Sequence, residues 1–187
     1  MWDALVVIVL CNSNFWMHFE YIAFSGFPLT FLLFYVFWSC KLFPESMYVT
    51  TFEINLLQVI LMLLLIDIFQ TVCHYLAHTH LRHTLLGRSH AIHHTNRNPK
   101  PQDAFFTGIV DSVAQVIIPI CLVLHIVEPS KYSAILFGSL YSWWLLFLHS
   151  DPCHEYKILE YLHIVTPKYH HKHHTNPTTN FSNLLRL

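Results

Sequence analysis

Long runs of apolar residues alternate with short polar segments along most of the chain. A helix needs about 20 mostly apolar residues to cross a bilayer, and four runs come close to that length. They cover residues 20–40, 54–73, 108–127 and 132–148. The N-terminal run, residues 2–11, is too short to cross alone and lacks the basic lead of a signal peptide, so we expect an interfacial or partly buried segment. The pattern predicts an all-α integral membrane bundle of about four transmembrane helices, which forms one domain over residues 1–187.

The composition supports a bilayer as the solvent for this bundle. Hydrophobic residues make up 54% of the chain and charged residues 11%, whereas a soluble domain usually carries roughly a quarter charged residues. The net charge of −1 implies no nucleic-acid partner. The five cysteines are odd in number and scattered without a CxxC pair, so we expect no disulfide framework.

Basic residues are distributed unevenly between the two sides of the predicted bundle. One side holds only Lys41 and Lys131. The side on which the second and fourth spans end holds Arg82, Arg88, Arg97, Lys100, Lys157, Lys168, Lys172 and Arg186. The positive-inside rule places this larger set in the cytosol.

Sixteen histidines are the most unusual feature of the composition, and most lie in two segments, residues 74–94 and 149–174. Both segments follow spans that end on the cytosolic side, so we expect them to form a histidine-rich helical cap there. Their motifs are one HxxxH and two HxxHH: His74 and His78; His90, His93 and His94; His170, His173 and His174. Residues at i and i+4 share a helix face, so both imidazoles of such a pair can reach one ion. The adjacent histidine of each HxxHH offers a second direction, so one turn can serve two metal ions.

His149, at the end of the fourth span, is expected to complete the ligand shell. Neutral imidazole suits iron, zinc, copper and nickel, and spacing alone does not choose among them. Five more histidines near the site are either additional ligands, orienting groups or proton carriers: His80, His83, His154, His163 and His171. His18 and His125 lie away from the motifs, and we expect them to be ordinary polar residues.

Two carboxylates are predicted to orient metal-bound imidazoles by accepting a hydrogen bond from them. Asp67 lies inside a span, seven residues before His74, which places it on the same helix face about 10 Å away. Such a carboxylate can accept the second N–H of a metal-bound imidazole; the alternative is a pairing with Gln70 or a buried hydroxyl. Asp151 closely follows His149 and is a similar candidate, and Asp103 and Asp111 are weaker ones.

Several enzyme classes are disfavoured by missing motifs. The chain has no HExxH, no Walker-type loop and no dinucleotide-binding glycine loop. Electrons from NAD(P)H would therefore have to arrive through a separate redox protein. Aromatic residues in the spans, such as Phe34, either line a lipid path or are ordinary packing residues.

The histidine motifs resemble the three boxes of the fatty acid hydroxylase/sterol desaturase superfamily. HYLAH (74–78), HAIHH (90–94) and HHKHH (170–174) match these boxes. The resemblance extends from Asp67 to Ser182, a region of residues 67–182. It includes the lone His149, Thr166-Pro167 before the last box and Asn180-Phe181-Ser182 after it.

The resemblance implies a cytosolic dimetal centre that uses O2 to hydroxylate or desaturate a lipid: a sterol, a fatty acyl chain or a sphingolipid. It implies two iron ions, with zinc as a possible substitute, a cytochrome b-type haem donor with its reductase, and the endoplasmic reticulum membrane. Tyr75 departs from the basic residue often found after the first histidine. The family usually continues to a Trp-Asp segment, whereas this sequence stops soon after Leu184, so we expect either a minimal member or a C-terminally truncated chain.

Two other functions remain open from the sequence. One is a membrane metal-binding or metal-transport protein, although transporters place their ligands near the midplane of the bilayer and these histidines gather at one end of the spans. The other is an inactive scaffold that keeps a structural metal pair. Turnover with an added electron donor would separate both from an oxygenase.

Overall fold

The computed structural model describes residues 26–186, and these residues form helices without any β-strand. The long elements are α3 (Phe27–Ser39), α4 (Leu56–His78), α7 (Ile118–Val127) and α8 (Lys131–Leu148). The short ones are η1 (Glu45–Tyr48), α5 (Leu85–His93), η2 (Pro101–Phe105), α9 (Lys157–Tyr161) and α10 (Pro167–Thr175). The predicted all-α class is therefore confirmed for the described part of the chain, whereas the N-terminal segment and His18 lie outside it.

Local sequence signals explain where the long helices begin and end. The Asn55 side chain caps α4 by accepting from the backbone N–H groups of Leu57 and Gln58. The Ser130 side chain caps α8 in the same way, by accepting from Ser133 N–H. Between α7 and α8 the chain turns sharply at Glu128, whose φ of 47° is left-handed.

Two helices are long and apolar enough to cross a membrane: residues Leu56–His78 and the continuous helix Ile109–Val127. The second consists of α6 (Ile109–Asp111), η3 (Ser112–Ile117) and α7. α3 is apolar but has 13 residues, and the start of the predicted span 20–40 lies outside the described residues. α8 has 18 residues but includes serines along its length, which lower its hydropathy. Of the four predicted spans, two therefore have the length and hydropathy of a membrane helix.

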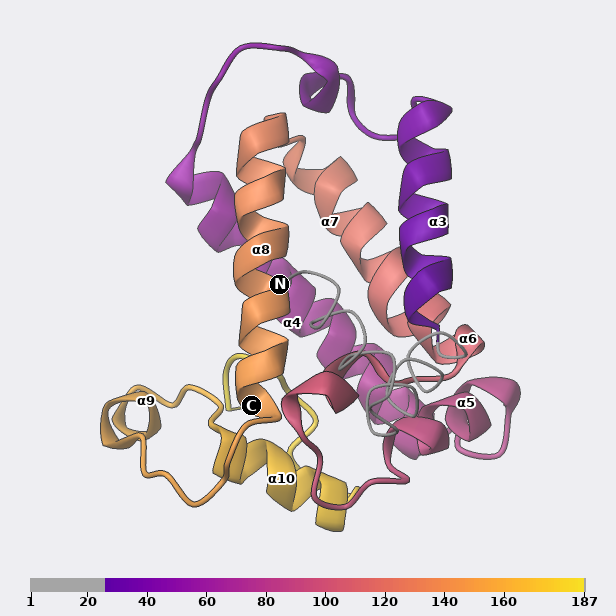
Figure 1. Ribbon diagram of the computed structural model, residues 1–187, viewed down its shortest axis with the longest axis vertical. Helices are drawn as coiled ribbons and strands as arrows, with labels where there is room; N and C mark the ends of the chain where they lie inside the picture. Colours follow the sequence, from indigo (N-terminus) through magenta and orange to yellow (C-terminus); the bar gives the residue numbers. More distant parts are fainter. Residues whose placement is uncertain (1–25, 187) are drawn as a thin grey trace, which may run out of the picture.

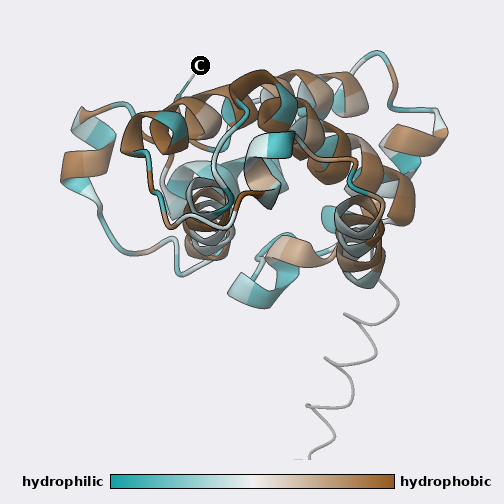
Figure 2. Cartoon of the chain, turned by 90° about the horizontal axis from the view of Figure 1, so that it is seen from above, coloured by the Kyte–Doolittle hydropathy of each residue, from teal (hydrophilic) through white to brown (hydrophobic). Residues whose placement is uncertain are grey.

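The core of the bundle lies where α4, α7 and α8 pack together, with Met62, Ile66, Val123 and Phe137 fully or almost fully buried. The opposite face of α4 is also apolar but exposed: Leu57 keeps 74% and Ile60 54% of its surface accessible. A helix that is apolar on both its packed and its exposed face is suited to the hydrocarbon core of a membrane. Figure 2 shows the hydrophobic colouring concentrated on these long helices.

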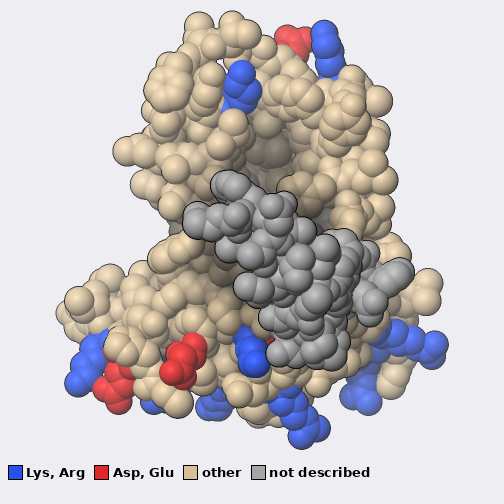
Figure 3. Space-filling model, in the orientation of Figure 1, with Lys and Arg blue, Asp and Glu red and all other residues tan. Residues whose placement is uncertain are grey.

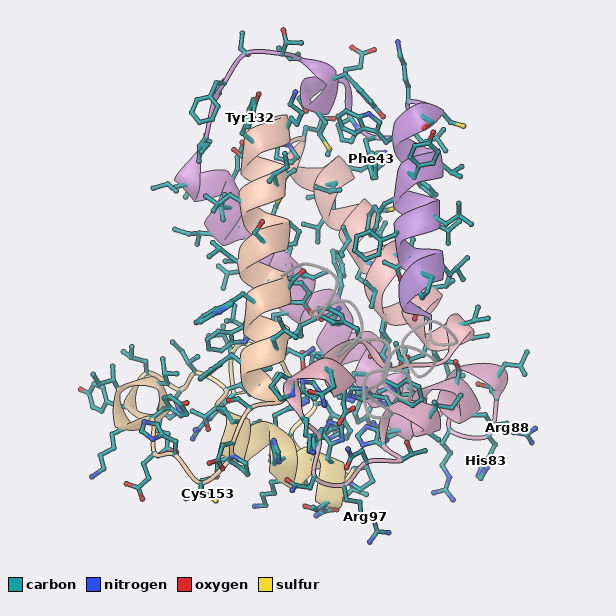
Figure 4. All side chains as sticks on the ribbon, in the orientation of Figure 1. Phe43, His83, Arg88, Arg97, Tyr132 and Cys153 are labelled. Atoms are coloured by element: carbon teal, nitrogen blue, oxygen red, sulfur yellow. The ribbon has the colours of Figure 1, made fainter. Side chains whose placement is uncertain are left out.

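The two ends of the bundle differ in chemistry. The long helices run side by side, and α5, α9 and α10 lie across one end of them (Figure 1). Figure 4 places Phe43 and Tyr132 at the upper end and Arg88 and Arg97 at the lower end. On the face drawn in Figure 3, lysine and arginine side chains gather mainly along this lower edge. The short helices α5, α9 and α10 thus share one end with most of the basic residues.

The helix Ile109–Val127 contains a π-helical segment, η3, immediately after Asp111. Such segments insert a wider turn into a helix and are frequent at functional sites. Here the wide turn accompanies a contact between the Asp111 carboxylate and the Gln115 amide. Both side chains are buried and face the histidine-rich end.

Candidate metal centre

Nine imidazoles from separate parts of the sequence meet beneath the long helices. They come from the last turns of α4, from α5 and its C-cap, from the C-cap of α8 and from α10: His74, His78, His90, His93, His94, His149, His170, His173 and His174. Figure 4 shows a cluster of side-chain nitrogen atoms between the bundle and α10. The structure thus brings together every histidine of the three motifs and His149.

The nine imidazoles form two groups of possible metal ligands. His74, His78, His90, His94 and His173 form a five-histidine group, and His93, His149, His170 and His174 form a four-histidine group. Within each group the ligand atoms lie within 4.8 Å of one another. The groups adjoin, since the rings of His94 and His174 have centroids 4.6 Å apart. Each HxxHH motif contributes to both groups, as its sequence suggested.

The Nε2 atoms point inward in both groups. In the five-histidine group, His78 Nε2 lies 2.9 Å from that of His90 and 3.1 Å from that of His94. In the four-histidine group, His149 Nε2 lies 3.4 Å from that of His93 and 3.2 Å from that of His170. In each group the Nε2 atoms therefore converge on one point, and the two points are neighbours.

Backbone carbonyls fix the tautomer of four of these rings. A carbonyl oxygen only accepts, so a ring nitrogen bonded to it must carry the proton, and the other nitrogen of the neutral ring keeps a lone pair. The Nδ1 atoms donate as follows: His74 to Phe181 O at 2.7 Å, His93 to Phe106 O at 3.1 Å, His149 to Leu145 O at 2.8 Å and His173 to Thr179 O at 2.6 Å. The Nε2 atoms of these rings therefore present lone pairs to the centres of the two groups.

Bound cations explain the inward-facing lone pairs of these rings better than hydrogen bonds between the rings do. His93 and His149 both keep a lone pair at Nε2, so no proton bridges their 3.4 Å separation. His74 Nε2 is buried without a hydrogen-bond partner, which is costly for a polar atom. Lone pairs that face one another repel unless a positive charge lies between them. The donor set is all imidazole, which suits iron, zinc, copper or nickel.

A buried carboxylate orients His90. The carboxylate oxygens of Asp111 lie 3.0 and 3.1 Å from His90 Nδ1. Thr107 and Gln115 donate to the same carboxylate, and Ser89 Oγ accepts from the Asp111 backbone N–H at 3.0 Å. The pairing turns His90 Nε2 toward its group and strengthens the ring as a ligand, as carboxylates behind metal-bound histidines do.

Burial lowers the pKa of several of these imidazoles. Desolvation, reinforced by neighbouring imidazoles, lowers the pKa of His93 to about 4 and that of His149 to about 3. Desolvation also lowers the pKa of His173 to about 4. The pKa values of His94, His170 and His174 shift in the same direction for the same reason. Because a metal ion binds only the neutral ring, the groups are ready to act as ligands at neutral pH.

The structure corrects the roles predicted for two carboxylates. Asp67 accepts hydrogen bonds from the backbone N–H groups of residues 183–185, at 2.8 to 3.0 Å, in place of the expected imidazole. Asp151 is exposed and accepts from Cys153 N–H. Asp111, a weaker candidate from the sequence, has the imidazole contact. Helical spacing put Asp67 on the correct face, but the C-terminal segment folds back between it and the histidines.

The five additional histidines lie outside both groups. His80, His83, His154 and His163 are exposed, and His163 lies in a turn with a φ of 54°. His171 is buried on α10 but belongs to neither group. Proximity in sequence to the motifs is therefore a poorer guide than helical spacing.

A cavity of about 70 Å³ opens beside the histidines and has a polar wall that the sequence did not single out. Gln70 accepts from the Tyr141 hydroxyl and, at 3.1 Å, from Asn183 Nδ2. The Gln70 amide in turn donates to Gln115 O at 2.6 Å. A glutamine in the middle of an apolar span is the sequence signal that could have identified this wall, because polar groups in membrane helices are costly and usually functional.

Comparison with known proteins agrees with the geometry. A family model described as fatty acid hydroxylase matches residues 59–187, and the chain belongs to that family. The chain is also 30% identical, over 162 residues, to a protein of Phaeodactylum tricornutum named "Alternative squalene epoxidase". The alignment covers 86% of this chain and 46% of that protein, so the chain spans about half the length of this relative. No solved structure matches the chain.

Proposed function

We propose that this protein is a membrane-bound di-iron oxidoreductase that uses O2 to hydroxylate or desaturate a lipid. The observation that supports it most is the convergence of nine Nε2 atoms on two adjacent points, with several tautomers fixed so that lone pairs face inward. The family match supports it as well, because the family's description, fatty acid hydroxylase, names a lipid-oxidising reaction. Iron rather than zinc follows from the reaction, because zinc has no redox chemistry.

The proposed site residues divide into ligands and groups that orient them. The ligands are the five- and four-histidine groups. The carbonyl oxygens of residues 106, 145, 179 and 181 and the Asp111 carboxylate hold the rings in place. This support fixes the geometry of the site before any ligand arrives, which is how proteins prepare a metal site for catalysis.

When bound, a pair of iron ions supplies the O2 activation and electron transfer that protein side chains cannot provide. The protein's own part is to hold the nine imidazoles and to place one carbon of the substrate near them. For hydroxylation, one oxygen atom enters a C–H bond and the other leaves as water, with two electrons and two protons consumed. For desaturation, the substrate loses two hydrogens, and with two further electrons and two protons both oxygen atoms leave as water.

The cavity beside the histidines is where we place the reacting carbon. It touches rings of both groups, including His74, His93 and His149. Its volume of about 70 Å³ admits only a narrow part of a molecule, and its polar wall of Gln70 and Tyr141 is held by internal hydrogen bonds. A narrow cavity limits the access of bulk water and so protects a reactive oxidant from side reactions.

The oxidised molecule is proposed to be a sterol, a fatty acyl chain or a sphingolipid. The relative from Phaeodactylum tricornutum is named for an epoxidation of squalene, which adds one oxygen atom of O2 to an alkene. An alkene is therefore a further candidate for the reacting group in this chain. Each of these candidates has a large hydrocarbon part that resides in a membrane.

Topology and electron supply complete the proposal. We infer four spans, with α3 and α8 joining the two long apolar helices, and a histidine-rich cap on the cytosolic side of the endoplasmic reticulum membrane. The one-sided set of lysines and arginines supports this orientation. Electrons from NAD(P)H would come through a cytochrome b-type haem protein and its reductase, for which this basic face is a suitable docking surface.

The test is lipid profiling of cells that express the full chain or its His170→Ala variant, with iron supplied to both. The proposed function predicts an oxidised lipid that depends on His170, and O2 uptake by the purified protein when reductant and that lipid are both present. Metal binding without any lipid oxidation would favour an inactive scaffold. Metal accumulation across the membrane would favour a transporter.

A further inference from the structure

Three cavities line up between the far end of the bundle and the histidines. The far cavity, of about 420 Å³, lies between α3, α7 and α8, and a middle cavity of about 170 Å³ follows it. These two share Phe34 and Ile120 as walls. The middle cavity shares Ala104, Thr107, Val116 and Leu145 with the cavity beside the histidines. Shared walls make the three cavities neighbours along one path, which narrows toward the metal centre.

The chemistry of the walls changes along this path. The far and middle cavities expose mostly apolar surface, and Lys131, at the far end, is the one charged side chain among the described residues that line them. Polar groups contribute a larger share of the wall at the other end, where His93, His149 and His170 line the third cavity. A hollow between α3 and α8 is visible on the face drawn in Figure 3. An apolar path with one polar, reactive end matches a hydrocarbon that is bound along its length and oxidised at one position.

The length of the path can be estimated from the residues of helix α8 that line it. Lys131 begins the helix, Gly138 lines the far cavity, Leu145 lines the middle one and His149 follows the last residue. At 1.5 Å per residue, Lys131 and His149 are about 27 Å apart along the axis and Gly138 and His149 about 16 Å. The path is therefore long enough for an extended lipid chain rather than for a small molecule.

We propose that these cavities form one hydrocarbon-binding passage, which delivers the reacting carbon to the four-histidine group and whose usable depth is set at Gly138. This inference deepens the proposed function by assigning the substrate's binding path, and it rests on that function for the chemistry at the end of the path. Three of the four histidines of that group line the terminal cavity: His93, His149 and His170. The five-histidine group contributes His74 and His90 to it.

Gly138 is the position at which the passage can be altered most cleanly. A Cβ built there meets no atom within 4 Å, so a larger side chain fills open space rather than displacing the core. A tryptophan at this position would occupy the far cavity and shorten the passage. Leu140 on the same helix keeps 42% of its surface exposed, and Leu140→Trp is therefore a matched control that adds bulk outside the passage.

The test uses the full chain in detergent with a palmitic acid analogue that carries a mid-chain diazirine. After photolysis, mass spectrometry locates the labelled residues. The passage predicts labels on its walls, at Phe34, Val116 or Ile120, and roughly tenfold weaker labelling in Gly138→Trp, the loss expected when about two buried methylenes are displaced. Leu140→Trp should label like the wild type. A second variant, Ala134→Phe, narrows the same far cavity and should weaken labelling in the same way.

Labels confined to outward-facing residues such as Leu122, or equal wall labelling in all variants, would overturn the passage. The readout is binding, so it does not depend on turnover. Wall labelling in a protein that oxidises no lipid would support the passage and count against the proposed function. If Gly138→Trp changes neither lipid oxidation nor labelling, the proposed function is supported and the passage is refuted.

Discussion

The Asp111 carboxylate lies 3.0 Å from Nδ1 of His90, in a buried pocket that Thr107 and Gln115 complete. This pairing holds the His90 ring with Nε2 toward the five-histidine group. We predict that Asp111→Asn weakens metal affinity by about 10- to 100-fold, the usual effect of losing a carboxylate behind a histidine ligand. Titration of the iron-loaded protein with a chelator measures the change. Asp151→Asn is the control, because this carboxylate is exposed, and equal losses in both variants would refute the role of Asp111.

Ligand variants should remove one metal ion at a time. His170→Ala deletes a ligand of the four-histidine group, and we expect the metal content to fall by about half, because the five-histidine group keeps its full donor set. His154→Ala removes an exposed histidine outside both groups and should leave the content unchanged. Elemental analysis of purified protein decides the outcome. Full metal content in His170→Ala would show that the two groups are not the binding sites.

How far the sequence predicts this structure depends on how local each feature is. Within each HxxHH motif, helical spacing alone predicts that the histidines lie close together. Residues at i, i+3 and i+4 share a helix face whatever the tertiary fold. The contact between Asp111 and His90 joins positions 21 residues apart through a π-helical turn, and no local pattern encodes such a turn. Asp67 was misassigned for the same reason: its partners come from a segment 116 to 118 residues later in the chain.

The prediction of membrane spans was also reliable only where the signal is local to one helix. Hydropathy predicted α4 and the helix Ile109–Val127 well, since each is long and apolar by itself. α3 and α8 have weaker signals, and whether they cross a membrane depends on the lipid and on their neighbours. The sequence offered Gln70 only as a partner for Asp67 and did not single out Tyr141, because only packing places both on the wall of the cavity.

Acidification should destabilise the metal-free protein. The pKa of His93 falls from 6.5 to about 4 on folding, that of His149 to about 3 and that of His173 to about 4. Between pH 6.5 and these values the unfolded chain binds more protons than the folded one, so the free energy of unfolding decreases as the pH falls. We expect the thermal midpoint of chelator-treated protein to drop steadily from pH 7 to pH 4.5.

The comparison that checks this pH dependence is the same series in a variant with fewer buried imidazoles. His93→Gln should reduce the slope of the thermal midpoint against pH below pH 6.5, because one group no longer gains a proton on unfolding. A midpoint that is independent of pH in the metal-free wild type would contradict the buried, neutral state of these rings.

Asp67 is predicted to be a structural residue that fastens the C-terminal segment. Its carboxylate accepts from three backbone N–H groups in residues 183–185. Asp67→Ala leaves these groups without their partner and should lower the free energy of unfolding by roughly 3 kcal/mol. Limited proteolysis should then cut near residues 180–185, which the wild type protects. Undiminished stability, with a specific loss of metal, would instead return Asp67 to the role first expected of it.

The central claim is that nine imidazoles hold two metal ions, and X-ray absorption spectroscopy of the iron-loaded protein, with elemental analysis of the same sample, tests it most directly. We predict two iron ions per chain, each surrounded by nitrogen ligands with the multiple-scattering signature of imidazole. A single ion per chain, or a shell dominated by sulfur or carboxylate oxygen, would contradict the account.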